Sequence, residues 1–356
     1  MRGLLVALLF VALACGSAAG AQVEGKRADD VQLLAQHLRD DHPDLFHDLS
    51  PEQFEAAVDE LTGRADSLDD DQLLVGLMRL AALPGVRDGH TGIFPLDPAN
   101  ERVLHMYPVR LYTFSDGTFV VGQADGSDLL RSRLVAVNGR PLEEVMAAVR
   151  PLVPHDNDAT LTLRTTTFLD TIEVLNGLGI APDAGPVTFT FERDRRQVGA
   201  SLTPISVPAY GRAIGDLVHP LIPQGITGAV PAYVARRNQQ LWTRKLAAGR
   251  VFYIGYNETR IGTWPASRAV LKAAKARRLR GIVVDLRNNP GGDNHTYAEL
   301  VEALRRVSKT KRAVVIISRA TFSAAENFAT ELERAAHPVF VGEDSGGSPN
   351  LYGDVT

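Results

Sequence analysis

The pattern of hydrophobic and polar residues changes twice along the chain. In the first part, residues 22–100, apolar residues recur every three or four positions, which is typical of amphipathic helices. The clearest of these helices begins at Ser50, because Ser-Pro-Glu-Gln forms a capping box with proline at the first helical position. Phe54, Val58 and Leu61 then fall on one face. The pattern predicts an N-terminal helical region.

The helical period is lost over residues 101–206. Short alternating runs rich in β-branched and aromatic residues, separated by turn pairs such as Asn-Gly, predict a β-rich domain with one helix over 142–149. The predicted strands cover 107–114, 118–123, 134–137 and 187–192. Residues 207–249 are rich in glycine and proline at first, and we treat them as a connector.

From residue 250 onward, buried strands alternate with amphipathic helices. Such alternation predicts βαβ units in an α/β fold, with functional sites at the carboxyl ends of the strands. The strands are predicted over 251–256, 281–286, 312–318 and 339–342, and the helices over 265–278, 295–307 and 324–336.

Length, composition and charge limit the class of protein. A chain of 356 residues with 45% apolar residues predicts two or three globular domains. Its formal net charge of −4 gives no case for a nucleic-acid partner, and no phosphate loop or dinucleotide fingerprint is present. We expect no metal or organic cofactor. The oligomeric state is not indicated.

The N-terminus has the composition of a secretory signal peptide. Arg2 precedes eleven apolar residues that end at Ala14, and small residues follow up to an A-x-A site at Ala21. The apolar run is too short to span a bilayer. We therefore predict a signal peptide over residues 1–21 and export to the periplasm or the extracellular space.

Cys15 is the only cysteine in the sequence. It follows Val-Ala-Leu-Ala, which resembles a lipoprotein box with its leucine one place closer to the cysteine than usual. Lipidation of Cys15 would make the protein a lipoprotein anchored to a membrane, whereas cleavage after Ala21 removes the cysteine, and we favour removal. In either case the mature domains have no intrachain disulfide and no thiolate nucleophile.

Ser323 lies at a predicted strand-to-helix corner, between the strand 312–318 and the helix 324–336. A serine there presents its hydroxyl beside the unpaired N–H groups of a helix N-terminus, which stabilise charge developing on a substrate carbonyl. Ser323 and Glu326 also have the spacing of a capping box, so helix capping alone is the alternative interpretation.

A glycine pair follows the neighbouring strand of the predicted sheet. Gly291 and Gly292 end the segment Asn-Asn-Pro-Gly-Gly, and glycine lets a backbone approach a ligand closely. The N–H of Gly291 or Gly292, together with that of Ala324, would form an oxyanion hole if the two strand ends meet. The alternative is a plain tight turn.

His90 is the candidate general base. It lies in the loop Asp-Gly-His-Thr, residues 88–91, which directly follows a helix predicted to end near residue 83. Asp88 is too close in sequence to orient His90, and we interpret it as a turn cap or an arginine partner. His295, just after the glycine pair, is a rival base.

Other chemistries have less support in the sequence. No lysine occurs after Lys311, which argues against a Ser–Lys dyad with its lysine beyond the serine. His37, His42 and His47 lack ligand-like partners, so we interpret them as surface residues of a helix and a loop rather than as metal ligands.

These segments, in this order, resemble those of the tail-specific (C-terminal-processing) and tricorn-like serine peptidases. The similarity covers 283–292, 321–326 and 342–347, and residues 88–91 resemble the histidine segment of the tricorn-like branch. The resemblance implies a crotonase-like α/β core over 250–356, preceded by helices and often by a PDZ-like module. Residues 134–139 resemble a PDZ strand and turn, although no carboxylate-binding glycine loop precedes them.

The resemblance also implies roles for single residues. Ser323 corresponds to the nucleophile, His90 to the base, and Gly291 or Gly292 with Ala324 to the oxyanion hole. The lysine of the Ser–Lys branch would fall at 345–350, where no lysine is present, and this favours histidine chemistry. The glutamate of the tricorn-like branch would lie beyond residue 356. We therefore expect further residues there, and the third catalytic member is not located.

The sequence thus predicts an exported serine endopeptidase that acts on a peptide or protein substrate. Two alternatives stay open at this point. One is a non-catalytic relative of the same fold that binds a hydrophobic ligand or a peptide, and the other is an esterase. The sequence indicates neither the substrate nor the cleavage preference.

Overall fold

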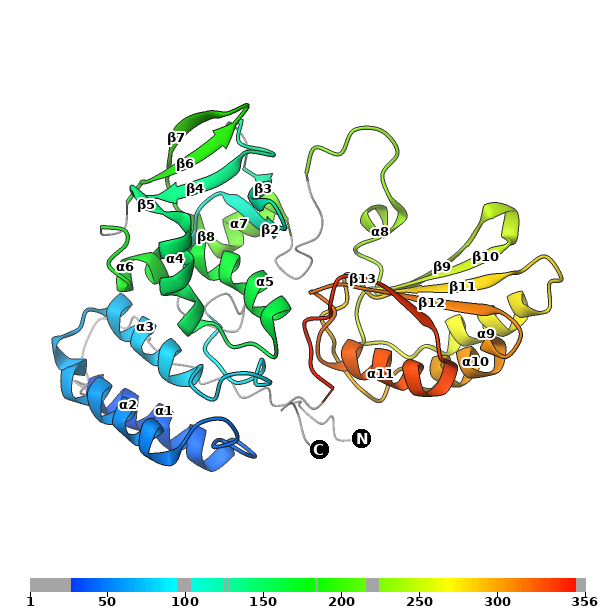
Figure 1. The fold of residues 1–356 in the computed structure, drawn as a ribbon, viewed down its shortest axis with the longest axis horizontal. Helices are drawn as coiled ribbons and strands as arrows, with labels where there is room; N and C mark the ends of the chain where they lie inside the picture. The colour runs from blue at the N-terminus through cyan, green and yellow to red at the C-terminus, as the bar shows by residue number, and fades with distance from the viewer. Residues whose placement is uncertain are drawn as a thin grey trace. The chain divides into compact units, whose positions relative to one another are not determined.

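The computed structural model describes residues 27–94, 104–124, 126, 128–182, 185–215 and 224–349 (Figure 1). The described chain divides into two compact units. The first contains residues 27–155 and 161–215, and the second contains residues 156–160 and 224–349. The predicted signal peptide and Cys15 lie outside the described residues. No helix in the described ranges is long and apolar enough to cross a membrane.

The first unit begins with three amphipathic helices, α1 (Arg27–Asp41), α2 (Pro51–Arg64) and α3 (Asp70–Ala81), with a short 3₁₀ turn η1 (Ala65–Ser67) before α3. The predicted capping box of α2 is confirmed. The Ser50 hydroxyl accepts a hydrogen bond from the Gln53 N–H (3.2 Å), and the Gln53 side chain accepts one from the Ser50 N–H (3.0 Å).

An antiparallel sheet forms the rest of the first unit. Its strand order is β2-β3-β4-β6-β7, with β5 paired to the free end of β4, and a separate pair is formed by β1 and β8. The strands are β1 (His105–Met106), β2 (Val109–Phe114), β3 (Gly117–Gln123), β4 (Arg133–Val137), β5 (Arg140–Pro141), β6 (Val187–Arg193), β7 (Arg196–Leu202) and β8 (Ile205–Ser206). Four helices and a 3₁₀ turn accompany them: α4 (Leu142–Val149), η2 (Arg150–Leu152), α5 (Asp158–Leu169), whose first residues belong to the second unit, α6 (Ile172–Gly177) and, after β8, α7 (Val207–Ile214).

The second unit is a single five-stranded sheet with the order β13-β12-β11-β10-β9. Its strands are β9 (Leu241–Leu246), β10 (Val251–Tyr256), β11 (Gly281–Asp285), β12 (Arg312–Ile317) and β13 (Val339–Gly342). β9 is antiparallel to β10, and the other strands run parallel to one another. The carboxyl ends of the parallel strands therefore lie at one edge of the sheet.

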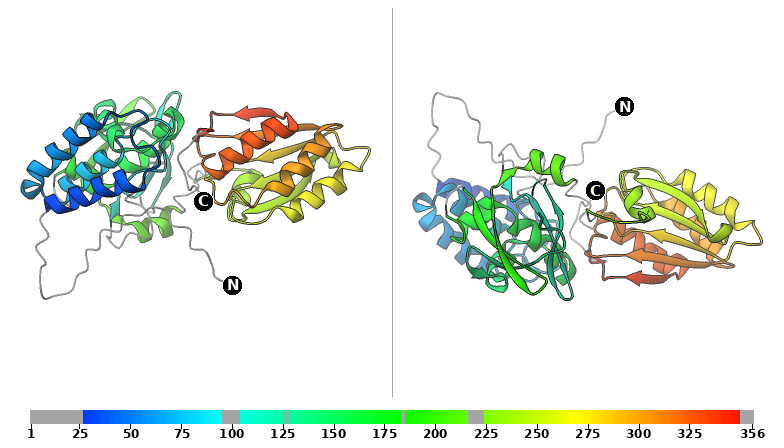
Figure 2. Two further views of the ribbon diagram at one scale, coloured as in Figure 1. Left: turned by 90° about the horizontal axis from the view of Figure 1, so that it is seen from below. Right: turned by 90° about the horizontal axis from the view of Figure 1, so that it is seen from above.

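Helices α9 (Trp264–Ala274), α10 (Ala298–Ser308) and α11 (Ala324–Ala336) connect the parallel strands, while α8 (Ala232–Ala235) precedes β9 and η3 (Ala247–Gly249) follows it. The three connecting helices lie on the same face of the sheet (Figure 2). This is expected when each crossover has the same hand and each new strand is added beside the previous one. The core between sheet and helices is apolar, with Ile254, Val284 and Phe328 almost fully buried.

Most predicted elements of the second unit are confirmed, but the sequence analysis missed others. The strands over 251–256 and 339–342 and the helices over 142–149 and 324–336 have the predicted bounds. The region 207–249, interpreted as a connector, contributes β9 to the sheet. The β-rich region also holds α5 and α6, in addition to the one helix predicted there.

Candidate active site

Ser323 lies at a sharp corner between β12 and α11. Its backbone dihedrals, φ 54° and ψ −127°, are unusual for a residue other than glycine. Although Ser323 occupies the N-cap position of α11, its side chain makes no capping hydrogen bond to that helix. The capping-box interpretation of Ser323 and Glu326 is therefore wrong, and the strained corner needs another explanation.

The backbone of Gly291 lies directly against this corner. A Cβ atom on Gly291 would lie 2.7 Å from the Ser323 Cβ, 2.9 Å from the Phe322 carbonyl oxygen and 3.0 Å from the Ala324 nitrogen. Gly291 also has a φ of 108°, which side-chain-bearing residues rarely adopt. Only glycine fits here, and the loops that follow β11 and β12 are in contact.

Hydrogen bonds hold these loops together, and two of them come from the residues just before Ser323. The Phe322 N–H donates to the Asn289 carbonyl oxygen (3.2 Å), and the buried Thr321 hydroxyl donates to the Leu286 carbonyl oxygen (2.9 Å). Both bonds connect residues more than thirty positions apart in the sequence. The position of the Ser323 corner is therefore set by the end of the neighbouring strand and not by α11 alone.

The fully buried Asn289 side chain organises the glycine loop. Its amide group donates to the Tyr256 carbonyl oxygen (3.0 Å), while its oxygen accepts hydrogen bonds from the Thr259 hydroxyl (3.0 Å) and the Gly291 N–H (3.0 Å). The Gly291 N–H is thus engaged inside the loop. As an oxyanion donor it would first have to leave Asn289.

Two other backbone N–H groups in these loops are available as donors. Among the described residues, no hydrogen bond from the Gly292 or Ala324 N–H is found. Ala324 is the first residue of α11, whose initial N–H groups have no partner within the helix and carry the positive end of the helix dipole. This is an environment that stabilises a developing negative charge.

Glu326, one turn into α11, is a buried carboxyl group. Burial raises its pKa, and the charges of Asp156 and Glu333 act in the same direction, while a hydrogen bond with Ser345 opposes them. A carboxyl group held towards its neutral form adds less negative charge at the helix N-terminus than an ionised one. The positive field around the Ala324 N–H is therefore better preserved.

An ion pair between the half-buried Arg287 and the buried Asp285 anchors the end of β11. Arg287 contacts Asp285 through Nη2 and Oδ2 (2.6 Å) and lies 4.0 Å from the centre of the Tyr233 ring. The Tyr253 hydroxyl also donates to Asp285. Burial, followed by the Asp285 charge, raises the pKa of Tyr253, so this hydroxyl stays protonated as a donor.

His90 belongs to the first unit, in the loop after α3. Burial lowers the pKa of His90 to about 4, and the nearby positive charge of Arg164 acts in the same direction, while Asp88 opposes them. The Arg164 Nη1 donates to the carbonyl oxygens of Gly89 and Pro154, at 2.6 Å each. His90 is thus a neutral imidazole near pH 7. Its predicted meeting with Ser323, which belongs to the second unit, stays a prediction.

Asp88, His42 and His47 differ from what the sequence suggested. Asp88 does cap a turn, accepting the Thr91 N–H at 3.3 Å, but its side-chain partner is His42 (3.0 Å) and not an arginine. The side chains of His42 and His47 are only 3% and 5% exposed, so interpreting them as surface residues was wrong. The contact joins residues 46 positions apart and has no periodic signal in a single sequence.

The rival base His295 lies in the second unit, after the glycine pair. Its side chain is 81% exposed, and its Nδ1 contacts Asp293 at 2.9 Å. Within the described ranges, no group of three His, Cys, Asp or Glu side chains is arranged to hold a metal ion. Exposure makes His295 a weaker candidate than His90, because a catalytic base acts best where water is excluded.

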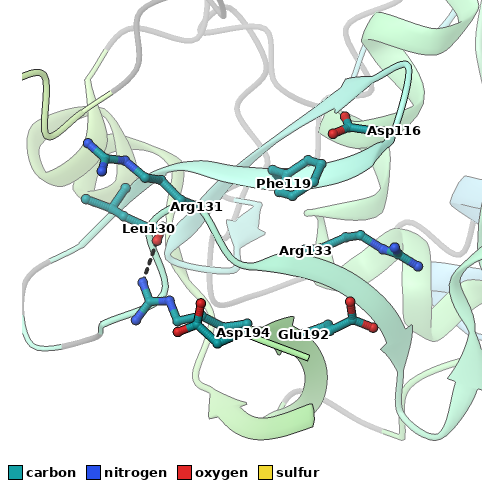
Figure 3. Close-up of a pocket in the computed structure, with 8 residues that line it drawn as sticks. Asp116, Phe119, Leu130, Arg131, Arg133, Glu192 and Asp194 are labelled. Carbon is teal, nitrogen blue, oxygen red and sulfur yellow. Dashed lines mark hydrogen bonds between the residues drawn. The ribbon is translucent and has the colours of Figure 1, made fainter. Parts of the chain in front are cut away.

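A pocket on the sheet of the first unit contains none of the predicted site residues (Figure 3). Most of its lining side chains are charged, and Arg193 closes one side by donating to the Leu130 carbonyl oxygen (2.5 Å). Ligand sites are usually lined mainly by apolar groups. The pocket is lined by Asp116, Phe119, Leu130, Arg131, Arg133, Glu192, Arg193 and Asp194, and we assign it no function.

No family model and no curated protein matches the sequence. Among solved structures, mature CPAF complexed with lactacystin is similar, with a TM-score of 0.58 and 14% identity over 90% of this chain and 84% of that chain. The photosystem II D1 C-terminal processing protease gives a TM-score of 0.39 and 13% identity over 91% of this chain and 82% of that one. Only the first similarity is high enough to bear on the fold.

At 14% identity, the similarity to CPAF concerns the fold and not individual residues. The mixed α/β arrangement of sheets and helices is shared over most of both chains. This chain therefore shares the fold of mature CPAF.

Proposed function

We propose that the chain is an exported serine endopeptidase, with Ser323 as nucleophile, His90 as general base and backbone N–H groups as oxyanion hole. One observation carries the proposal. Ser323 is held in a strained conformation at a helix N-terminus, its side chain does not cap that helix, and the Gly291 backbone packs against it. Strain of this kind persists where function requires it.

The proposed reaction follows from the chemistry of these groups. The Ser323 hydroxyl attacks the peptide carbonyl carbon as its proton passes to the neutral imidazole of His90. The carbonyl oxygen becomes an oxyanion, which the N–H groups of Gly292 and Ala324 stabilise. The imidazolium then gives its proton to the leaving amine, and an acyl-enzyme forms. Water hydrolyses this ester through the same steps, with His90 accepting the proton of the water.

The electrostatic surroundings of His90 have two consequences for this role. Its lowered pKa leaves it neutral at physiological pH, which is the state that a general base needs, but a pKa of about 4 also makes it a weaker proton acceptor than an ordinary histidine. The negative charge of Asp88 favours the imidazolium that forms during the reaction. The proposed chemistry uses no metal or organic cofactor.

The same proposal covers the finer features of architecture and location. We interpret the second unit as a crotonase-like core and the sheet of the first unit as a PDZ-like module that packs without capturing a peptide C-terminus. The signal peptide over residues 1–21 would direct export, with membrane anchoring only if Cys15 is lipidated. These assignments are supported by the sequence motifs quoted above.

The experiment replaces Ser323 with Ala in the full chain and measures labelling by a fluorophosphonate probe. We expect S323A to lose labelling, while Ser308→Ala, a change on α10, leaves it intact. Labelling of S323A at the wild-type level would remove Ser323 from the mechanism. Parallel assays with peptide and ester substrates distinguish an endopeptidase from an esterase, because only the former cleaves the amide series.

A further inference from the structure

The loop that carries His90 includes a backbone conformation that is unfavourable for one of its residues. Within residues 84–91, which we name the histidine loop, Gly85 has a φ of 87° and Arg87 a φ of 72°. A left-handed conformation at a residue such as arginine costs about 1–2 kcal/mol. The loop must therefore be held by contacts from outside itself.

Three of those contacts come from one short segment after α1. Residues 42–48, which we name the brace, contact the histidine loop at three points. His42 bonds to Asp88, His47 Nε2 faces the Val86 carbonyl oxygen at 3.2 Å, and Asp48 lies 3.5 Å from the Arg87 guanidinium. The last contact is exposed and weak, whereas the His42–Asp88 contact joins two buried side chains.

The His42–Asp88 contact has a defined proton arrangement. His42 Nδ1 accepts the Asp44 N–H at 3.0 Å, so the proton of the neutral ring lies on Nε2. Nε2 then donates to Asp88 Oδ2 at 3.0 Å, and the two side chains are 3% and 1% exposed. A buried hydrogen bond to a carboxylate is among the stronger ones, and leaving one partner unsatisfied is costly.

His47 supports His42 from one side. The two rings are stacked, with centroids 6.1 Å apart and planes 10° from parallel. His47 Nδ1 also faces the Asp44 carbonyl oxygen at 2.9 Å. Because Asp44 contacts both rings, the brace behaves as one folded turn rather than as separate side chains.

Asp88 transmits this fixed position to His90. One carboxylate oxygen of Asp88 binds His42, and the other accepts the Thr91 N–H at 3.3 Å. The Asp88 side chain therefore links the residue two positions before His90 to the residue directly after it. Arg164 holds the intervening Gly89 carbonyl oxygen at 2.6 Å. The backbone of His90 is thereby fixed at Asp88, Gly89 and Thr91.

We infer that His42 is a positioning residue for the general base: by holding Asp88, it fixes the histidine loop and thereby the direction of the His90 imidazole. This inference rests on the proposed function, in which His90 accepts the Ser323 proton. His42 itself touches no reacting atom. A displacement of about 1 Å in a catalytic group costs roughly 100-fold in rate, so such a brace has a kinetic effect beyond stability.

The test compares two amide substitutions of His42 in the full chain. In H42N the amide replaces Nδ1 and is too short to reach Asp88, whereas in H42Q the longer amide replaces Nε2 and still donates to Asp88. Kinetics on a peptide substrate give kcat and KM separately. Hydrogen exchange reports on the amides of residues 86–91, and His37→Asn, an exposed histidine on α1, is the matched control.

We expect H42N to lower kcat about 100-fold with little change in KM, and H42Q to recover at least about tenfold of that loss. Exchange should accelerate in residues 86–91 of H42N but not in α3, and H37N should behave like wild type. If H42N does not fold, His47→Asn replaces it, because it removes the ring that stacks on His42 and leaves the charge of Asp88 unchanged.

The inference is overturned if folded H42N keeps the wild-type kcat, or if H42N and H42Q lose activity equally with unchanged exchange. A purely structural role would lower the unfolding temperature of H42N without a selective loss in kcat, and this result also overturns it. Failure of the proposed function is distinguishable. In that case S323A turns over peptide like wild type, and the role of His42 in catalysis is refuted together with it.

Discussion

Replacing Gly291 with Ala is the most direct perturbation of the proposed oxyanion hole. The new methyl group would lie 2.7 Å from the Ser323 Cβ and 3.0 Å from the Ala324 nitrogen, both closer than van der Waals contact allows. The backbone φ of 108° is also unfavourable for alanine. The change therefore acts on stability and on the space in front of the donor at the same time.

The two effects have separate magnitudes. Positive φ in a non-glycine residue costs about 1–2 kcal/mol, and overpacking adds about 1–3 kcal/mol, so the free energy of unfolding should fall by roughly 2–5 kcal/mol. If the methyl group shields the Ala324 N–H from an oxyanion, the acylation rate of Ser323 should fall by about 100-fold to 1,000-fold, as for the loss of one oxyanion donor.

Urea denaturation measures the first effect, and the rate of fluorophosphonate labelling of folded protein measures the second. Gly342→Ala is the matched control, because Gly342 has a φ of 124° and its Cβ would lie 2.1 Å from the Ile317 carbonyl oxygen. It should lose stability but label at the wild-type rate once folded. Wild-type labelling of folded G291A would refute the reasoning, since the methyl group would then occupy space that the chemistry does not use.

Three further predictions concern stability and are checked by urea denaturation. Because unfolded His90 takes up a proton near pH 6.5 and folded His90 only near pH 4, stability should fall by up to about 3 kcal/mol as the pH decreases between these values. His90→Gln should flatten this slope, and an unchanged slope would contradict the assignment. Asp285→Asn should lower the free energy of unfolding by about 1–3 kcal/mol, because the half-buried Arg287 guanidinium loses its charged partner, and no loss would show that the pair is not needed. His337→Gly should add about 1 kcal/mol, because His337 ends α11 at a φ of 47°, and a destabilised variant would refute this.

The second unit was predictable because its sequence signals are local. Apolar runs and amphipathic periods fixed the bounds of β10 (Val251–Tyr256) and α11 (Ala324–Ala336), and the rule that parallel strands share an edge brought the predicted loops together. The contact between Gly291 and Ser323 follows from this arrangement. No sequence pattern could show that the Gly291 N–H donates a hydrogen bond to the Asn289 side chain.

Features that depend on tertiary contacts were missed. α5 (Asp158–Leu169) is rich in threonine, which favours strands intrinsically, yet Thr165 forms a back-bond to the Leu161 carbonyl oxygen (2.6 Å) within the helix. β9 (Leu241–Leu246) is recognisable only from its pairing with β10. The same holds for the brace, because the contacts of its histidines are with the histidine loop, which is distant in the sequence.

The strictly sequential strand order of the second unit has a consequence for folding. From β9 to β13, each strand pairs with the strand immediately before it in the chain, so no pairing waits for a distant segment. Chains with such short-range contacts close smaller loops and fold faster than those whose neighbours are far apart in sequence. The segments carrying Gly291 and Ser323 follow successive strands, and their mutual geometry can form as soon as β11 and β12 have paired.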